Sequence, residues 1–230
     1  MHKYPAKAAV FLVIQTLCAM IAAFFFFTHR DVSAQLNTGT LIVWALLGIQ
    51  NESLAIHDQR GNIYISTIEA VFFAAYLSGG VLAAFVCITA TVLFSFRVQD
   101  GTIRHALSKP FRLTLFNHTH FIVALLVVDT IFKWLVRITG GLLVLPAFLT
   151  APVFFMVSCF LNALFYYFEE DRDFMNYLIR VFRPFYMDAL IASSGAIIIS
   201  LTYPRYGILS SLFFITPIIM ARLTFLERVS

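Results

Sequence analysis

Seven strongly polar residues interrupt the long apolar runs of this 230-residue chain, and they are the places where chemistry could occur. These residues are Glu52, Glu69, Asn117, His118, His120, Asp129 and Asn162. In hydrocarbon, a charged or strongly polar side chain costs about 2.5 to 3.5 kcal/mol even on the most lenient insertion scale. Each of the seven is therefore a candidate for binding, pairing or lining a cavity.

The two histidines have the wrong spacing for a shared metal site. His118 and His120 are two residues apart and face nearly opposite sides of a helix, whereas a chelating pair on one helix needs a separation of four. The chain also shows no Ser-His-Asp grouping and no phosphate-binding glycine loop. We therefore expect no metal, no cofactor and no enzymatic activity.

For the remaining polar residues, a structural role is an alternative to a functional one. Asp129 and Lys133 are four apart, which lets them neutralise each other on one helix face. Asn117 and Asn162 are expected to face the bundle interior. There they would bond to each other across helices, at about 1 kcal/mol each, or line a pocket.

The composition places these residues in a membrane protein. The chain is 60% hydrophobic and 12% charged, with a mean hydropathy of +0.87. We predict a single domain over 1–230, an all-α polytopic transmembrane bundle of about seven spans. The seven apolar runs cover 8–27, 40–56, 68–96, 113–135, 138–167, 187–203 and 206–225. The net charge of +4 indicates topology rather than a nucleic-acid partner.

The third run, 68–96, has one charge, Glu69, and Ser78-Gly79-Gly80 at its middle. Since a span takes roughly 20 residues, 29 residues are long for one crossing and short for two. If 68–96 crosses once and the N-terminus is cytoplasmic, six of the sixteen basic residues are cytoplasmic. For this topology the positive-inside rule therefore prefers the opposite orientation, with the N-terminus outside. If the chain turns back at the glycines, twelve are cytoplasmic. Both topologies place the 97–112 and 168–186 loops and the C-terminus in the cytoplasm.

A glycine pair at membrane depth points to a binding cavity, because non-helical backbone is tolerated there only where protein buries it or it lines a cavity. The alternative is one tilted helix with a glycine packing face. The candidate ligand-binding residues are Glu52, Glu69, Gly79, Gly80, Asn117, His120 and Asn162.

Two segments are expected at the membrane surface. Residues 54–66 alternate around a polar tip and predict a small hairpin or extended loop. Residues 171–188 carry apolar positions at helical spacing and predict an interfacial helix on the cytoplasmic leaflet, ending near Pro184. Pro146 and Pro152 are expected to kink or divide the 138–167 run.

Several short motifs together resemble a known family. They are the 63–80 stretch ending in Ser-Gly-Gly, Leu115-Phe116-Asn117, Asn162 within Phe160-Leu-Asn, and TPIIMARLTF at 216–225. They resemble the polytopic N-terminal input domains that precede bacterial cyclic-di-GMP enzymes of the HD-GYP and GGDEF classes. The resemblance covers roughly 40–226. The chain also looks related to the substrate-binding S components of energy-coupling-factor transporters.

The first resemblance implies a sensory domain of the bacterial inner membrane that binds an unidentified small molecule. Its last helix, with Pro217, would signal to a cytoplasmic output domain or partner protein. The second implies an uptake protein for a vitamin or similar solute. Membrane lipid is an expected partner in both, and a homodimer is compatible with either. The chain reaches Ser230 without a GGDEF or HD-GYP segment, which suits an excised input domain or a stand-alone membrane protein.

Overall fold

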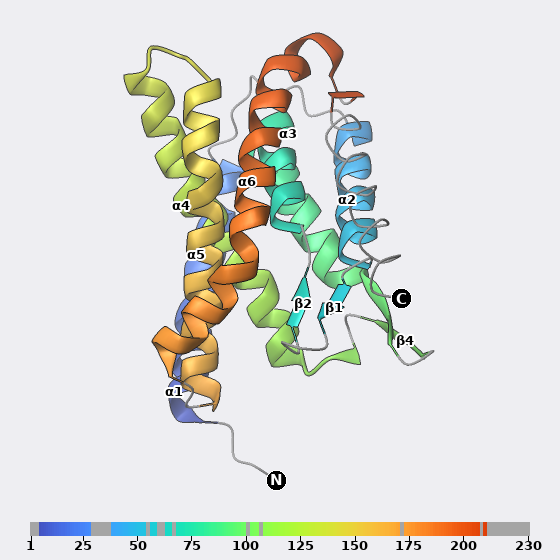
Figure 1. Ribbon diagram of the computed structural model, residues 1–230, viewed down its shortest axis with the longest axis vertical. Coiled ribbons are helices and arrows are strands. Elements are labelled where there is room, and N and C mark those ends of the chain that lie inside the picture. The colour runs from blue at the N-terminus through green and yellow to red at the C-terminus, as the bar shows by residue number, and fades with distance from the viewer. Residues whose placement is uncertain are drawn as a thin grey trace.

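The computed structural model describes residues 5–28, 38–53, 56–58, 63–65, 68–99, 102–105, 108–170, 173–207 and 209–210. These residues form six α-helices and two short antiparallel hairpins (Figure 1). The helices are α1 (Ala6–Thr28), α2 (Thr38–Ser53), α3 (Ile68–Phe94), α4 (Phe111–Ile138), α5 (Val144–Glu170) and α6 (Phe174–Tyr206). The predicted all-α class is confirmed, with the two hairpins as additions.

The hairpins lie in the connections before and after α3. β1 (Ile56–Asp58) pairs with β2 (Ile63–Ile65), which confirms the hairpin predicted within 54–66. β3 (Phe96–Gln99) pairs with β4 (Thr102–His105) in the segment 97–112, which was predicted to be a cytoplasmic loop. Both hairpins lie in the lower half of Figure 1, just below the lower end of α2 and above the start of α1.

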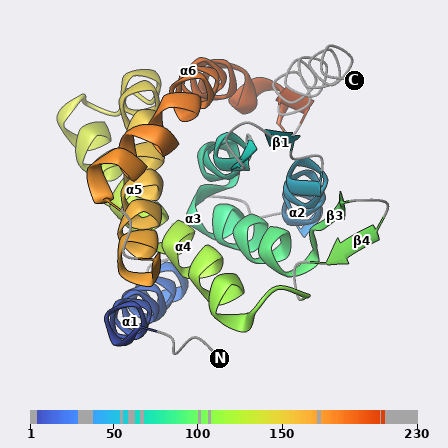
Figure 2. The same ribbon diagram turned by 60° about the horizontal axis from the view of Figure 1, so that its bottom comes forward.

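The path of α3 shows that the chain turns back. At Gly80 the backbone leaves the helical region, with φ 73° and ψ −173°. The helix follows β2 and precedes β3, so both of its ends lie at the lower end, and Figure 2 shows two segments meeting at an angle. The segments 68–79 and 81–94 are about 18 and 21 Å long, short of a bilayer core of about 30 Å. The segment 68–96 therefore turns back at Gly80 within the bundle, as one of the two topologies predicted, and its re-entry into a membrane stays a prediction.

The number of spans is smaller in the described residues than the seven expected. By length and composition, α1, α3 and α5 could cross a membrane, but α3 is broken. α2 has 16 residues, fewer than the roughly 20 needed. Most of the seventh run, 206–225, lies outside the described residues. α5 runs unbroken through Pro152, and Pro146 lies in its first turn, where proline is tolerated.

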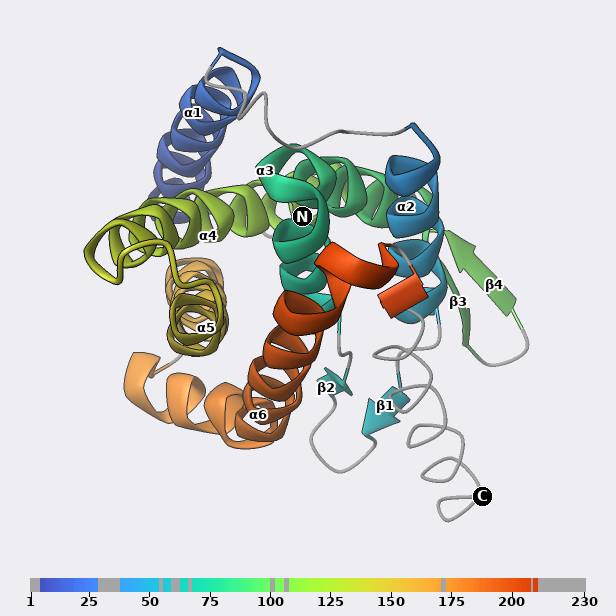
Figure 3. The same cartoon turned by 90° about the horizontal axis from the view of Figure 1, so that it is seen from above.

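The interfacial helix was predicted to end near Pro184, and that end is wrong. α6 continues from Phe174 to Tyr206 and is capped by Asp173, whose Oδ1 accepts the Asn176 backbone N–H at 3.1 Å. Its first turns lie across the lower end of α5, and the helix then changes direction and runs to the upper end (Figures 1 and 3). The amphipathic segment is thus the first part of a longer helix.

The core surrounds α3, which packs against α2, α4 and α6. Its first segment is almost entirely buried, and the largest buried side chains around it include Trp44, Phe72, Phe73, Phe154, Phe155 and Leu125. The outer side of α1 instead exposes large apolar side chains, among them Val10, Ile14, Leu17, Met20 and Phe24. An apolar surface of this extent is typical of a lipid-facing helix.

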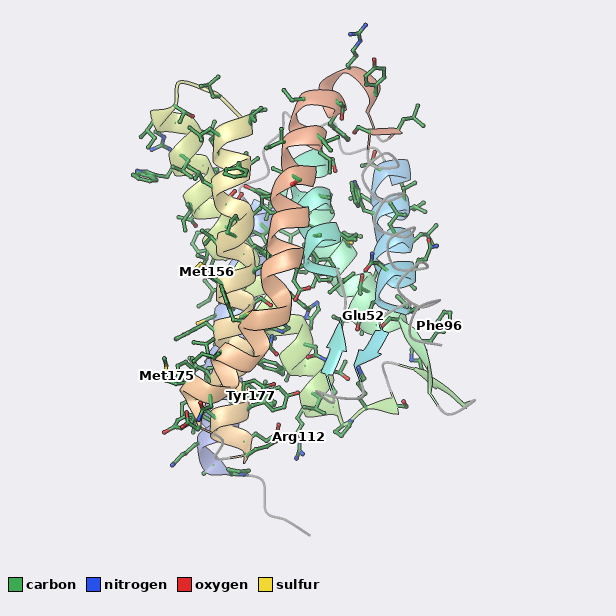
Figure 4. All side chains as sticks on the ribbon, viewed as in Figure 1. Glu52, Phe96, Arg112, Met156, Met175 and Tyr177 are labelled. Carbon is green, nitrogen blue, oxygen red and sulfur yellow. The ribbon has the colours of Figure 1, made fainter. Side chains whose placement is uncertain are left out.

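Polar residues mark two levels along the bundle axis. At the lower end, Arg112 pairs with Glu169 at 3.1 Å and Tyr166 packs on Tyr177 (Figure 4). At the upper end, Lys133 and the 58% exposed Trp134 occupy α4. Arg112 and Lys133 are 21 residues apart, or about 32 Å of helix. That length matches the bilayer core, and aromatic residues are typical of both interfaces.

Candidate functional site

The turn of α3 is held by two glycines with different roles. Gly80 adopts a positive φ with an extended ψ, a backbone conformation that residues other than glycine rarely adopt. Gly79 is buried, and an added Cβ would lie 2.5 Å from Ala83 Cβ and 3.7 Å from Thr40 Cγ2. Gly80 therefore permits the turn, and Gly79 permits the close packing beside it.

The turn is connected to α6 through one residue of α2. Thr40, which faces Gly79, has its side chain close to that of Tyr203 of α6. Tyr203 also packs against the main hydrophobic core. We call Gly79, Gly80, Thr40 and Tyr203 the apex group. The sequence pointed to the glycines but not to the other two, because neither lies in a recognisable motif.

A second group lies where α1, α4 and α5 meet, centred on His120. The buried His120 donates from Nδ1 to the Phe116 carbonyl oxygen at 3.0 Å, which leaves Nε2 as an acceptor. Asn162 Nδ2 donates to that Nε2 at 3.4 Å and to the Ser158 carbonyl oxygen at 3.0 Å. The two N–H groups of Asn162 thus go to these acceptors rather than to Asn117. The imidazole is neutral in this arrangement.

Gln15 brings α1 into the same group. Its Nε2 donates to Thr119 Oγ1 at 3.0 Å and to the Phe116 carbonyl oxygen at 3.5 Å. Its Oε1 is buried and, within the described residues, has no hydrogen-bond partner; the same is true of Ser158 Oγ. We call Gln15, Thr119, His120, Ser158 and Asn162 the central polar cluster. A buried unsatisfied polar atom costs about 1 to 3 kcal/mol, so a ligand atom or water that bonds to it is stabilised.

A third contact holds the first segment of α3 against α4. The Tyr76 hydroxyl donates to Asp129 Oδ1 at 3.0 Å, and Lys133 Nζ lies 3.0 Å from Asp129 Oδ2. The predicted Asp129–Lys133 pair is therefore confirmed. Tyr76 was missed, because spacing along one helix carries no information about a partner on another.

The two histidines face different helices, as their spacing predicted. His118 Nε2 lies 3.0 Å from Thr89 Oγ1 of α3, while His120 contacts α5. The described part of the chain contains no cluster of three or more histidine, cysteine or acidic residues suited to a metal.

The other sequence candidates lie apart from these groups. Glu52 is half-buried in the last turn of α2, at its lower end (Figure 4), and Glu69 is buried in the first turn of α3. Glu69 and Gly80 are 11 residues apart, about 16 Å along the helix. Asn117 is half-buried on α4. The seven candidates therefore occupy several levels of the bundle, and the structure brings together His120 with Asn162 in addition to the neighbouring Gly79 and Gly80.

Comparison with known proteins gave no match to a family model, a curated protein or a solved structure.

Proposed function

We propose that this chain is a sensory, ligand-binding input domain of the bacterial cytoplasmic membrane. In this proposal the re-entrant α3 responds to a small molecule, and α6 carries the change toward a cytoplasmic output domain or partner. The observation that carries it is the apex group, in which the turn of α3 lies against Thr40 and the side chain of Thr40 lies close to Tyr203 of α6.

A ligand shifts a conformational equilibrium only by binding one state better than the other. A change in the angle between the two segments of α3 would move Gly79 against Thr40, and Thr40 would in turn move against Tyr203. α6 also packs directly against α3 and α5. Because α6 continues as a helix to Tyr206, a movement at Tyr203 is transmitted to the residues that follow α6.

The orientation is part of the proposal. In the turn-back topology, the sequence assigns twelve of the sixteen basic residues to the same side of the membrane as the 97–112 loop, so the positive-inside rule makes that side cytoplasmic. Lys133, Arg137 and Arg205 lie at the other end. The return of the chain to the cytoplasm would involve 211–230, including Pro217, which lies outside the described residues.

A second candidate is a small-solute uptake protein of the S-component type. It is favoured by the central polar cluster, where Gln15 Oε1 and Ser158 Oγ are buried acceptor and hydroxyl groups without a partner in the described residues. A polar solute seated there would be recognised by hydrogen bonds from α1 and α5. Such a protein needs no coupling between the apex group and the C-terminal segment.

A chimera separates the two candidates. The chain is joined after Ser230 to a GGDEF output domain, and cyclic-di-GMP is measured in cells and normalised to the folded protein in the membrane. Tyr203→Phe removes the hydroxyl that lies near the Thr40 side chain. The matched control is Tyr206→Phe, which alters an exposed tyrosine one turn further along α6.

For the sensory domain, Tyr203→Phe and Pro217→Ala should each change basal output by roughly 2- to 30-fold, the range for couplings of 0.5–2 kcal/mol. Tyr206→Phe should leave output unchanged. If both test variants fold normally and signal as the parent does, the coupling is absent and the solute-binding candidate gains support.

A further inference from the structure

The connection from α4 to α5, at the upper left of Figure 1, carries large exposed apolar side chains. They are Ile138, Leu142, Leu143 and Leu145, with exposed fractions between 46% and 62%. We call these residues the hairpin tip. Lys133 marks the upper limit of the bilayer core, and Ile138 follows it by five residues, about 8 Å of helix. An exposed apolar patch beyond the core is typical of a contact surface.

The backbone of this turn pairs its own polar groups. The Gly141 N–H donates to the Val136 carbonyl oxygen at 2.9 Å, and the Gly140 N–H donates to that of Arg137 at 3.4 Å. Gly140 has φ 67° and Gly141 has φ 92°, the left-handed conformation that closes a helix in this way. Pro146, in the first turn of α5, has no N–H to pair. Backbone with internal partners enters a poorly hydrated layer at low cost, because each unpaired group there costs free energy.

The apolar surface of the hairpin tip continues along the span. Exposed apolar side chains of α5 fall within about 60° of one another around the helix axis. They are Leu145, Leu149, Met156 and Phe160. On α4, Trp134 is exposed one turn before Ile138. Within a span such a surface faces acyl chains, which are as apolar as leucine. Its continuation at the tip points to phospholipid as the partner rather than to another protein.

Trp134 and Arg137 add the side-chain types that anchor helices at a membrane surface. Both side chains are exposed and lie within four residues of Ile138. Indole rings are enriched at the level of the headgroups, and a guanidinium group matches phosphate with its fork of N–H donors. The positive charge beside the apolar tip therefore complements the lipid boundary, where phosphate lies next to acyl chains.

We propose that the hairpin tip is a membrane anchor that inserts into the boundary between headgroups and acyl chains at the upper end of the bundle. Its side chains contact the upper part of the acyl chains, and Arg137 binds headgroup phosphate. The anchor holds α4 and α5, which carry all of the central polar cluster except Gln15, at a fixed depth. The inference requires that the bundle spans a bilayer, but not that it is a sensor.

Depth-dependent quenching of tryptophan fluorescence tests the proposal on the whole protein in nanodiscs. The chain has two tryptophans, Trp44 and Trp134. With both replaced by phenylalanine, Leu142→Trp places a single reporter at the tip. Phosphatidylcholine brominated near the headgroup end of its chains should quench this reporter more than phosphatidylcholine brominated near the chain ends. Met156→Trp, the control at the middle of α5, should show the reverse order.

A second comparison asks whether the leucines hold the tip in place. In Trp44→Phe, where Trp134 is the reporter, Leu142→Asn with Leu143→Asn should lower the quenching by the bromines near the headgroups. The matched control is Ile42→Asn with Leu46→Asn, which makes a similar change at exposed positions of α2 and should leave that quenching unchanged.

Four results would each overturn the proposal. Quenching of the Leu142→Trp reporter by aqueous iodide, but by neither lipid, would place the tip in water, where a protein partner is the better explanation. Protection from iodide and from both lipids would show that a second copy of the chain covers the tip. Stronger quenching by the deep bromines would place the tip inside the core. Unchanged quenching of Trp134 in the asparagine variant would show that the span alone sets the depth.

Discussion

The hydroxyl of Tyr76 on α3 donates to Asp129 on α4 at 3.0 Å, and Lys133 holds the other oxygen of the same carboxylate. The bond links the segment of α3 that enters the bundle to a helix that runs its full length. A re-entrant segment of about 18 Å has no anchor at a second membrane surface. Side contacts of this kind must therefore hold it in place.

Tyr76→Phe should lower the stability of the bundle by about 1.5 to 3 kcal/mol, the range for a hydrogen bond to a charged group. Thermal unfolding in detergent, followed by far-UV circular dichroism, measures the change. Tyr167→Phe, at an exposed tyrosine of α5, is the control and should be nearly neutral. Equal melting temperatures for the two variants would mean that the Tyr76 bond does not stabilise α3.

Gly80→Ala should destabilise the bundle by more than backbone strain alone. Alanine at the conformation of Gly80 costs about 1 to 3 kcal/mol, and relaxing that strain would change the angle between two buried segments. Gly140→Ala is the control, because Gly140 has φ 67° in open space. The yield of monodisperse protein after detergent extraction should fall further for Gly80→Ala. Similar yields would show that the turn of α3 is not required for folding.

Gly48→Ala should separate α2 from α3. An added Cβ would meet the Thr91 hydroxyl and would lie 2.8 Å from Cys87 Sγ. Overpacking of a tight contact typically costs about 1 to 3 kcal/mol. Thr91→Ala removes the hydroxyl, so the double variant should recover part of the loss. A double-mutant cycle of melting temperatures measures the recovery, and strict additivity would contradict the close approach of the two helices.

The turn-back topology places Ser108 and Gly140 on opposite sides of the membrane. With the native cysteines replaced, Ser108→Cys should resist an impermeant maleimide added to intact cells, and Gly140→Cys should react. After the cells are opened, both should react, because Ser108 is exposed beside the β3–β4 hairpin. Efficient labelling of Ser108→Cys from outside would reverse the proposed orientation.

Asn162 should couple energetically to His120 rather than to Asn117. Hydrogen bonds between membrane helices contribute on average about 0.6 kcal/mol and at most about 1.7. The cycle of Asn162→Ala with His120→Phe should show a coupling in this range, since the two side chains are 3.4 Å apart. The cycle of Asn117→Ala with Asn162→Ala should be additive. Coupling between Asn117 and Asn162, together with additivity for Asn162 and His120, would show that α4 and α5 pack in a different register.

Several features followed from the sequence because they depend on local chemistry. Hydropathy and length indicated a helical membrane protein, and two adjacent glycines marked the break in α3. The Asp129–Lys133 pair and the opposite directions of His118 and His120 follow from 3.6 residues per turn. The β1–β2 hairpin follows from alternation around a polar tip. In each case the interacting residues are close in the chain.

Tertiary packing decided the rest. The sequence left open whether 68–96 crosses the bundle once or turns back, because the count of basic residues favours a different orientation of the N-terminus for each topology. The location of both hairpins on the same side of α3 shows that the segment turns back. Pro184 did not end α6, which packs against α3 and α5, and such contacts can outweigh the cost of proline. The partners of Asn162, Tyr76 and Gln15 lie 42, 53 and 104 residues away. Helical periodicity tells which side of a helix a residue occupies, but only the packing of the helices determines what that side meets.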